Sequence, residues 1–288
     1  MHIFAEQLLN ALQMGVLLFL ISSGLSLIFG LMHVVNLAHG ALYMVGAYLA
    51  LTIARQTDSF MLALVLAPVL TAVVGAALER VLLRRTYGRG LHPQVLLTLG
   101  LVFCFDELVR IVWGSQIQTI EVPPSLAGTL SVAGMQVSTY RAFVVLVGII
   151  VVGALFFLFN RTRLGSQVRA SVDDREMAAS LGIDVKRLFT VLFALGAALA
   201  GLGGALAVPL FTAYPGMGSE ILISALVVVV VGGMGSMIGA LLASLLVSFA
   251  IVFGQVFVAE FATAMIYMVL IVVLLVRPQG LMGVSRPA

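Results

Sequence analysis

Polar residues are rare in this chain, and their spacing is the first guide to its chemistry. His33, Asn36 and His39 fall three residues apart, on one helical side if that stretch is continuous, and Tyr43 continues near that side. Such groups are costly inside an apolar medium. Two interpretations stay open: Asn36 and His39 hydrogen-bond backbone where two helices join, or they line a solute path with Gly40 and Tyr43. No third ligand accompanies the histidines, so no metal site is predicted.

A second polar group contains Asp106 and Arg110. Their spacing of four predicts an ion pair on one helix face, with Glu107 facing elsewhere. This pair is either structural or part of a gate or of a contact with a partner protein. An intramembrane enzyme is a weak alternative, because nothing marks a nucleophile. It would require His33, His39, Asp106 and Glu107 to converge in one water-filled cavity.

The chain lacks the phosphate-binding loop of an ATPase. The P-loop pattern G-x-x-x-x-G-K-[ST] requires a lysine, and the only lysine, Lys186, follows Gly182-Ile-Asp-Val without matching it. If the work of this protein is driven by ATP, the motor must be another chain.

A short helix is predicted over 171–181, inside the long segment 160–187 between two apolar stretches. Ser171 suits its N-cap, and Asp173 and Asp174 suit its first turn, where negative charge is favourable. Gly182 fits the position after the helix, where a left-handed residue ends it.

The same helix must dock onto something. Met177, Ala178 and Leu181 form a small apolar patch at helical spacing, and charged residues occupy the other side. It lies either on the membrane interface or against a partner protein, and we favour the partner.

The composition requires a membrane. The chain has 288 residues, of which 62% are hydrophobic and 9% charged, and its mean hydropathy is +1.19. So few charges cannot cover a globular surface, whereas spans of about 20 apolar residues suit a bilayer. We therefore predict an all-α polytopic membrane protein with eight or nine spans, some of them broken, and one membrane domain over 1–288. The candidate spans are 8–31, 36–54, 60–83, 93–113, 141–159, 188–209, 220–232, 238–258 and 262–276.

Arginine clusters predict the orientation. Short loops rich in Arg and Lys remain in the cytoplasm, and nine spans put all the clusters on that side. The N-terminus is then outside, the C-terminus is cytoplasmic, and 114–140 is an external loop. The net charge of +3 reflects this asymmetry rather than nucleic-acid binding. The clusters are Arg80, Arg84, Arg85 and Arg89; Arg161, Arg163, Arg169, Arg175, Lys186 and Arg187; and Arg277 and Arg286.

Two glycine-rich stretches, 196–205 and 232–239, predict close helix packing or a gate. Small residues let helices approach each other in lipid, and glycine-interrupted segments are frequent in the moving parts of transporters. The candidate residues are Gly201, Gly204, Gly232, Gly233, Gly235 and Gly239.

Several stretches resemble one known family, the LivH-type permeases of branched-chain amino acid ABC transporters. The most specific are Asn36-Leu-Ala-His-Gly40 and Asp174-Arg-Glu-Met-Ala-Ala-Ser-Leu-Gly-Ile183. The stretches 193–204 and 232–239 and the ending Arg277-Pro-Gln-Gly-Leu281 are also similar. The resemblance covers nearly the whole chain.

The resemblance implies an importer of five parts in a bacterial inner membrane. This chain and a second related permease form the path, two ATPase subunits dock on coupling helices, and a periplasmic or lipid-anchored protein delivers leucine, isoleucine or valine. Urea or short amides are alternative substrates, and an autonomous secondary transporter or channel is an alternative class. No cofactor is implied. The expected coupling residues are Asp173, Asp174, Arg175, Glu176, Ala178, Ala179 and Gly182.

Overall fold

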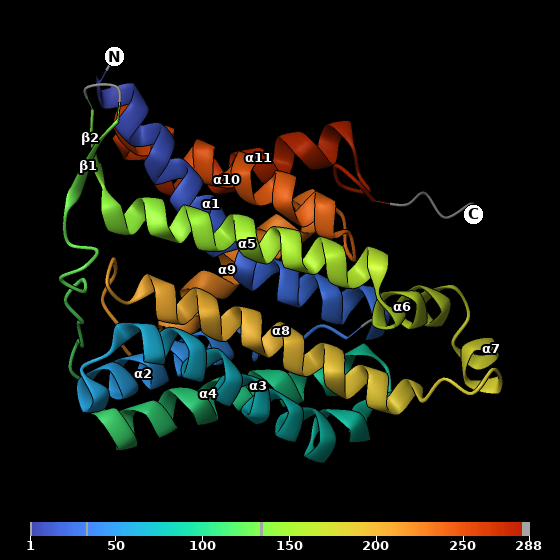
Figure 1. Cartoon of the computed structure of the whole chain (residues 1–288). Helices are drawn as coiled ribbons and strands as arrows, with labels where there is room; N and C mark the ends of the chain where they lie inside the picture. Colours follow the sequence, from blue (N-terminus) through green and yellow to red (C-terminus); the bar gives the residue numbers. More distant parts are fainter. Residues whose placement is uncertain (1, 33, 133–134, 284–288) are drawn as a thin grey trace.

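The structure is a computed structural model that describes residues 2–32, 34–132 and 135–283. Long helices run side by side (Figure 1). Their bounds agree with the predicted spans within three residues, except that the first helix begins at His2 rather than at residue 8. The helices are α1 His2–Met32, α2 His39–Thr57, α3 Phe60–Val81, α4 Leu91–Trp113, α5 Thr139–Arg161, α8 Val185–Ala207, α9 Met217–Gly232, α10 Met237–Phe257 and α11 Ala262–Val276. The all-α prediction is confirmed.

Shorter elements join these helices. A hairpin of two antiparallel strands, β1 and β2, pairs Thr129 with Ser138 and is a small exception to the helical fold. The short elements are η1 Leu83–Thr86, β1 Thr129–Val132, β2 Met135–Ser138, α6 Arg163–Asp173, α7 Arg175–Ser180 and η2 Ala259–Phe261.

Five helices of the described residues are long and apolar enough to cross a membrane: α1, α3, α5, α8 and α10. Apolar stretches of α9 and α11 are shorter, at Met217–Gly232 and Ala264–Val276. The chain is thus a multi-pass membrane protein by length and composition, since each long span covers about 30 Å at 1.5 Å per residue.

The two ends of the bundle differ (Figure 1). The N-terminus and the β1–β2 hairpin lie at one end, which we call the hairpin end. α6, α7 and the end of the described chain lie at the other, which we call the α7 end. The described residues of the arginine clusters flank the α3–α4 connection, the α5–α8 connection and the end of α11, all at the α7 end. Arg286 lies outside the described residues.

The core is centred on α8, which packs against α1, α2 and α3, while α1 also packs against α9 and α10. α4 packs against α2, and α5 packs against α1, at the edge of this group. The buried side chains of the main core include Leu20, Tyr48, Leu192 and Phe193.

Candidate functional site

The segment between α5 and α8 forms two helices, not the single predicted helix. The Asp174 backbone is extended (φ −149°, ψ 109°), and its carboxylate accepts from the N–H groups of Glu176 and Met177, both at 2.9 Å. Asp174 is therefore the N-cap of α7, because it satisfies donors that have no partner within the helix. The predicted cap at Ser171 is wrong, since Ser171 is buried within α6. Asp173 is the last residue of α6 rather than part of the first turn of α7.

The exposed apolar face of α7 is smaller than predicted. Met177 and Leu181 are 57% and 75% exposed, whereas Ala178 is buried at 2%. Ala178 thus belongs to the side of α7 that packs inward, while Glu176 and Ala179 are exposed. After α7, Gly182 takes the left-handed conformation expected for it, with φ +88°. The chain therefore presents two large apolar side chains on a small protruding helix.

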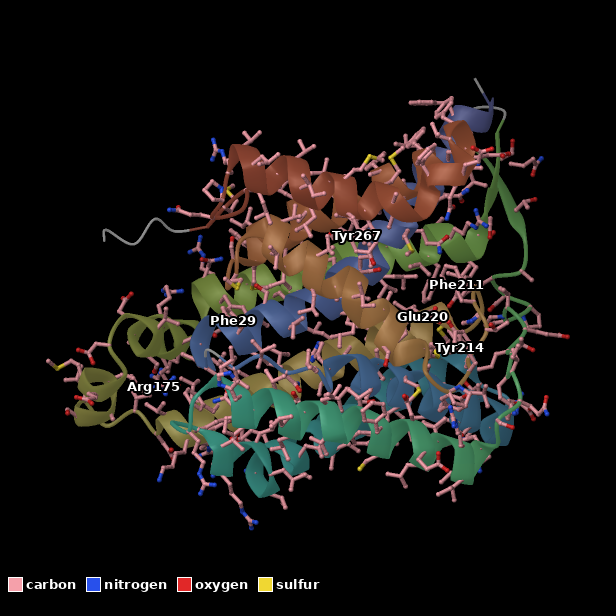
Figure 2. The ribbon with its side chains drawn as sticks, turned by 180° about the vertical axis from the view of Figure 1, so that it is seen from behind. Phe29, Arg175, Phe211, Tyr214, Glu220 and Tyr267 are labelled. Atoms are coloured by element: carbon pink, nitrogen blue, oxygen red, sulfur yellow. The ribbon has the colours of Figure 1, made fainter. Side chains whose placement is uncertain are left out.

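Arg175 faces the bundle rather than away from it. Its Nη2 donates to the backbone carbonyl of Leu31 on α1 at 3.1 Å, and its guanidinium carbon lies 4.6 Å from the ring centroid of Phe189 on α8. Figure 2 shows Arg175 at the α7 end, far from Tyr214 and Glu220. Arg175 therefore connects α7 to two core helices.

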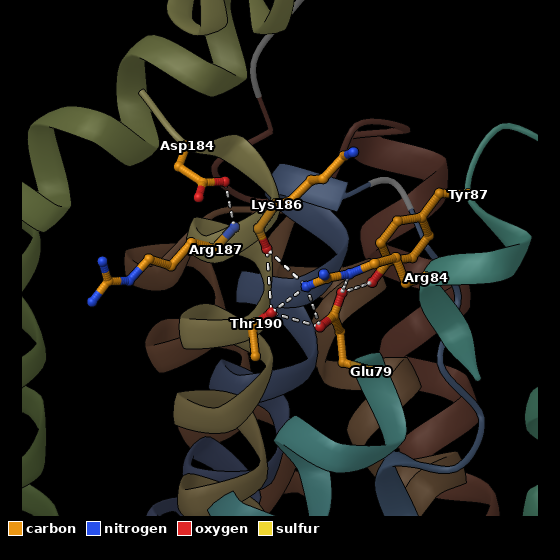
Figure 3. A network of polar contacts seen from close by, with 7 residues as sticks. All are labelled: Glu79, Arg84, Tyr87, Asp184, Lys186, Arg187 and Thr190. Carbon is orange, nitrogen blue, oxygen red and sulfur yellow. Dashed lines mark hydrogen bonds and ion pairs between the residues drawn. The ribbon is translucent and has the colours of Figure 1, made fainter. Parts of the chain in front are cut away.

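A buried ion pair that the sequence analysis did not single out lies nearby (Figure 3). The Glu79 carboxylate is fully buried, and Arg84 binds both of its oxygens, at 3.2 and 3.1 Å. Thr190 on α8 donates to Glu79 at 2.7 Å, and Tyr87 donates at 3.1 Å. Burial and the adjacent carboxylate raise the pKa of Tyr87, so its phenol remains a donor. Arg84 also donates to the carbonyl of Lys186 at 3.2 Å. This network fastens α3 and η1 to the start of α8.

Asn36 and His39 do not share a helix face, because 34–38 is not helical and α2 begins at His39. His33 lies outside the described residues. Both Asn36 and His39 are fully buried. Nε2 of His39 meets the carbonyl of Ile21 at 3.0 Å, so this nitrogen carries the proton and Nδ1 is left as an acceptor. Nδ1 of His39 and both amide atoms of Asn36 have no hydrogen-bond partner among the described residues.

Toward the hairpin end, Tyr43 is buried and its ring lies beside Gly203 of α8. Gly40 packs directly against the backbone of Gly218 on α9. The loop residue Tyr214 donates to Glu220 at 2.6 Å. Burial and this carboxylate raise the pKa of Tyr214 to about 12, so it stays protonated near neutral pH. Glu220 is a further polar residue that the sequence analysis did not single out.

The predicted pair of Asp106 and Arg110 is not formed. Arg110 lies 3.8 Å from Glu107 instead, and both side chains are exposed. One oxygen of Asp106 has no partner among the described residues. Glu107 is exposed on α4, whereas His39 is buried against α1, so these residues do not converge as an intramembrane enzyme would require.

The candidate glycines lie at close backbone contacts. A Cβ atom on Gly46 would lie 2.7 Å from the carbonyl oxygen of Gly201, and one on Gly204 would lie 2.9 Å from the Ala47 nitrogen. Gly232 and Gly239 pack against each other at the α9–α10 turn. In that turn Gly233 and Gly235 have φ of +96° and +85°, which side chains rarely tolerate. Gly235 and Gly239 therefore do not act as one helical motif, because Gly235 belongs to the turn.

The end of the described chain also reaches this turn. Leu281 and Met282 donate backbone hydrogen bonds to the carbonyls of Val231 and Gly232 at 2.8 and 3.0 Å. These carbonyls end α9 and have no partner within the helix. The segment after α11 thus caps α9.

Comparison with known proteins gives consistent relatives. The family described as "Branched-chain amino acid transport system / permease component" matches residues 7–275. The high-affinity branched-chain amino acid transport system permease protein BraD of Pseudomonas aeruginosa is 31% identical, over 81% of this chain and 80% of its own length. The corresponding LivH of Escherichia coli K12 is 27% identical, over 97% and 96%.

One solved structure has a similar fold. PsaBC from Streptococcus pneumoniae in complex with Fab aligns with a TM-score of 0.50 and 13% identity, and the alignment covers 93% of this chain and 89% of that one. At this identity the likeness concerns the fold alone.

Proposed function

The chain belongs to the family of permease components of branched-chain amino acid transport systems, and from this we propose that it forms part of an ATP-driven import path for leucine, isoleucine and valine. The match over 7–275 is the observation that carries the proposal. The chain would contribute no catalytic group of its own. Hydrolysis would take place on two ATPase subunits, and a second related permease would complete the path.

α7 is the proposed docking element for an ATPase subunit. Exposed Met177 and Leu181 suit an apolar pocket on a partner, and Glu176 and Asp173 offer charges beside them. Protein interfaces place apolar side chains at the centre and polar groups at the rim. Three other coupling candidates shape α7: Asp174 caps its first turn, Ala178 is buried on its inward side, and Gly182 follows its end.

The proposed orientation places the α7 end in the cytoplasm of a bacterial inner membrane. The gathering of arginines at this end supports it, because positively charged loops are retained inside. The hairpin end would then face the periplasm and meet a binding protein. Asn36, His39, Gly40 and Tyr43 remain candidates for the path. In this conformation Asn36 and His39 are buried, so they would be reached only after a rearrangement.

Uptake of labelled leucine and labelled urea by cells with and without the gene tests the proposal. We expect loss of ATP-dependent leucine uptake in the deletion, and its return only when the partner ATPases are present. Loss of urea uptake with unchanged leucine uptake would reject the substrate class. Leucine transport by this chain alone in liposomes would reject the dependence on an ATPase and favour an autonomous transporter.

A further inference from the structure

The α7 end of α1 is held on two sides. On one side Gly30 touches the α9–α10 turn, where a Cβ on Gly30 would lie 2.8 Å from Cα of Gly235. On the other side the carbonyl of Leu31 accepts the hydrogen bond from Arg175. The contact with Gly235 is a close approach of two backbones, whereas the hydrogen bond to α7 is made by a side chain, that of Arg175.

The bond to Leu31 satisfies a group that needs a partner. α1 ends at Met32, so the carbonyl of Leu31 has no acceptor role within its own helix. An unpaired carbonyl in apolar surroundings is costly, and a cation is favourable at a helix C-terminus. Arg175, which lies 144 positions from Leu31 in the sequence, supplies both the hydrogen-bond donor and the positive charge.

The guanidinium of Arg175 also packs over the ring of Phe189, and Phe189 contacts further residues at the α7 end. The rings of Phe189 and Tyr87 meet edge to face at 5.6 Å between centroids. Tyr87 in turn donates to Glu79, which the ion pair and Thr190 join to α8. These contacts hold α3, η1 and the start of α8 together. Arg175 packs against this group through the ring of Phe189.

The chain beyond α1 is suited to rearrange. The non-helical residues 34–38 lie shortly after α1, and Asn36 is buried there with both amide atoms lacking a hydrogen-bond partner within the described part of the chain. An unpaired buried amide raises the free energy of this conformation relative to one in which it is hydrogen-bonded. A small displacement of the end of α1 therefore acts on a connection whose buried Asn36 amide has no hydrogen-bond partner among the described residues.

We propose that Arg175 is the positioning residue that transmits movement of α7 to the end of α1 and thereby to the 34–38 connection. The inference rests on the proposed function, since it assumes that a partner moves α7. It differs from docking in a specific way: Arg175 acts toward the interior of the permease, whereas Met177, Leu181 and Glu176 act toward the partner.

The test uses the complete transporter, reconstituted with its ATPase subunits and binding protein. Arg175→Ala should keep ATPase co-purification and basal ATP hydrolysis. It should reduce ATP-driven uptake of the substrate roughly tenfold, a typical size for a lost coupling between two sites. Arg175→Lys should restore part of it, because an ammonium can donate to Leu31 and rest on Phe189. The matched control is Arg187→Ala, which removes another exposed arginine, near the start of α8, and should leave the coupling to position 35 intact.

Position 35 gives a direct readout. In a Cys104→Ser background, Val35→Cys should react with a thiol label at a rate that changes when ATP is added, and Arg175→Ala should abolish that change. If Arg175→Ala does not fold, Phe189→Leu should weaken the same response, because it removes the ring beneath the guanidinium.

Each outcome bears on one proposal. Failure of the unaltered chain to co-purify with any ATPase would reject the proposed function. Unaltered uptake and labelling in Arg175→Ala would reject only the transmission role, and lost ATPase co-purification in that variant would make Arg175 a docking residue instead. An unchanged labelling response in Phe189→Leu would also count against transmission.

Discussion

The central helices and the edge helices of this bundle are built differently. α1, α2, α8 and α9 meet backbone to backbone through glycine, as Gly24 meets Gly196 and Gly40 meets Gly218. On α4 and α5, Gly100 and Gly153 have no neighbouring atom within 4 Å of a Cβ position, and large side chains such as Phe103 and Phe157 are exposed. Glycine thus has a steric role where a helix faces the centre, as Gly148 of α5 also does against Val16 of α1, and none at these two outward positions.

The contrast follows from the solvent. Lipid provides no hydrophobic force that would press two apolar helices together, so close packing must supply the attraction. Edge helices can leave large apolar side chains against acyl chains without cost. The centre is therefore where a single methyl group matters, and where a rearrangement must move whole helices rather than side chains.

The largest effect is expected from filling a central glycine. Gly204→Leu places a side chain against the backbone of Tyr43 and Ala47, and should lower the free energy of unfolding by more than about 3 kcal/mol. Gly153→Leu on α5 is the matched control and should be tolerated, because that site is open. Thermal unfolding of the purified proteins in detergent distinguishes them. Equal loss of stability in both would remove the proposed difference between centre and edge.

The next effect concerns the polar fastening of α3 to α8. Arg84→Ala leaves the buried Glu79 carboxylate without its cation and should cost about 3 kcal/mol. Arg85→Ala is the control, since Arg85 is exposed and its guanidinium has no side-chain partner among the described residues; it should stay within about 0.5 kcal/mol. Adding Glu79→Gln to Arg84→Ala should recover part of the loss. No recovery in the double variant would show that packing, not charge, holds this contact.

Much of the fold was predictable because a membrane span is encoded by length and hydropathy alone. Each of the predicted spans has a helix as its counterpart, although only five of these helices are long and apolar enough to cross a membrane over their described residues, and the left-handed Gly182 was anticipated from its type. The short hairpin was not anticipated, because four-residue strands leave too little alternation to detect.

The candidate site was less predictable, since it depends on contacts between distant residues. Thr190 and Glu79 lie 111 residues apart, and no pattern in the sequence around either residue predicts their hydrogen bond. One signal was available: Glu79 is an acid in the last turn of an apolar span beside arginines, and such residues seldom lack a partner. Asp174 was predicted in the first turn of the helix, whereas it is the N-cap of α7. Its carboxylate binds the backbone N–H groups of the next turn, and this competes with a continuation of α6 through that residue.

A smaller effect on stability is expected at α7, which belongs neither to the central helices nor to the edge helices of the bundle. Asp174→Ala removes the N-cap and should destabilise α7 by about 1 kcal/mol, with little change in global unfolding. Substrate-stimulated ATP hydrolysis should fall, while Asp174→Asn, also a good cap, should retain it. Ser180→Ala is the control, because Ser180 is exposed on the same helix and its hydroxyl donates to the Glu176 carbonyl within that helix at 3.0 Å. If Asp174→Asn failed as Asp174→Ala does, the carboxylate would be required by a partner rather than by the helix.

The substitutions with the smallest expected effect test the orientation of the bundle in the membrane. In a Cys104→Ser background, Ser125→Cys between α4 and β1 and Ser166→Cys on α6 are both exposed substitutions at opposite ends. Neither should change stability by more than about 0.5 kcal/mol. A membrane-impermeant thiol reagent added to intact spheroplasts should label position 125, and position 166 should react only after permeabilisation. Labelling of both from outside would contradict an odd number of spans between these residues and the shared side of the arginines. Labelling of 166 alone would invert the orientation, placing α7 where no ATPase could reach it and so removing the physical basis for coupling through Arg175.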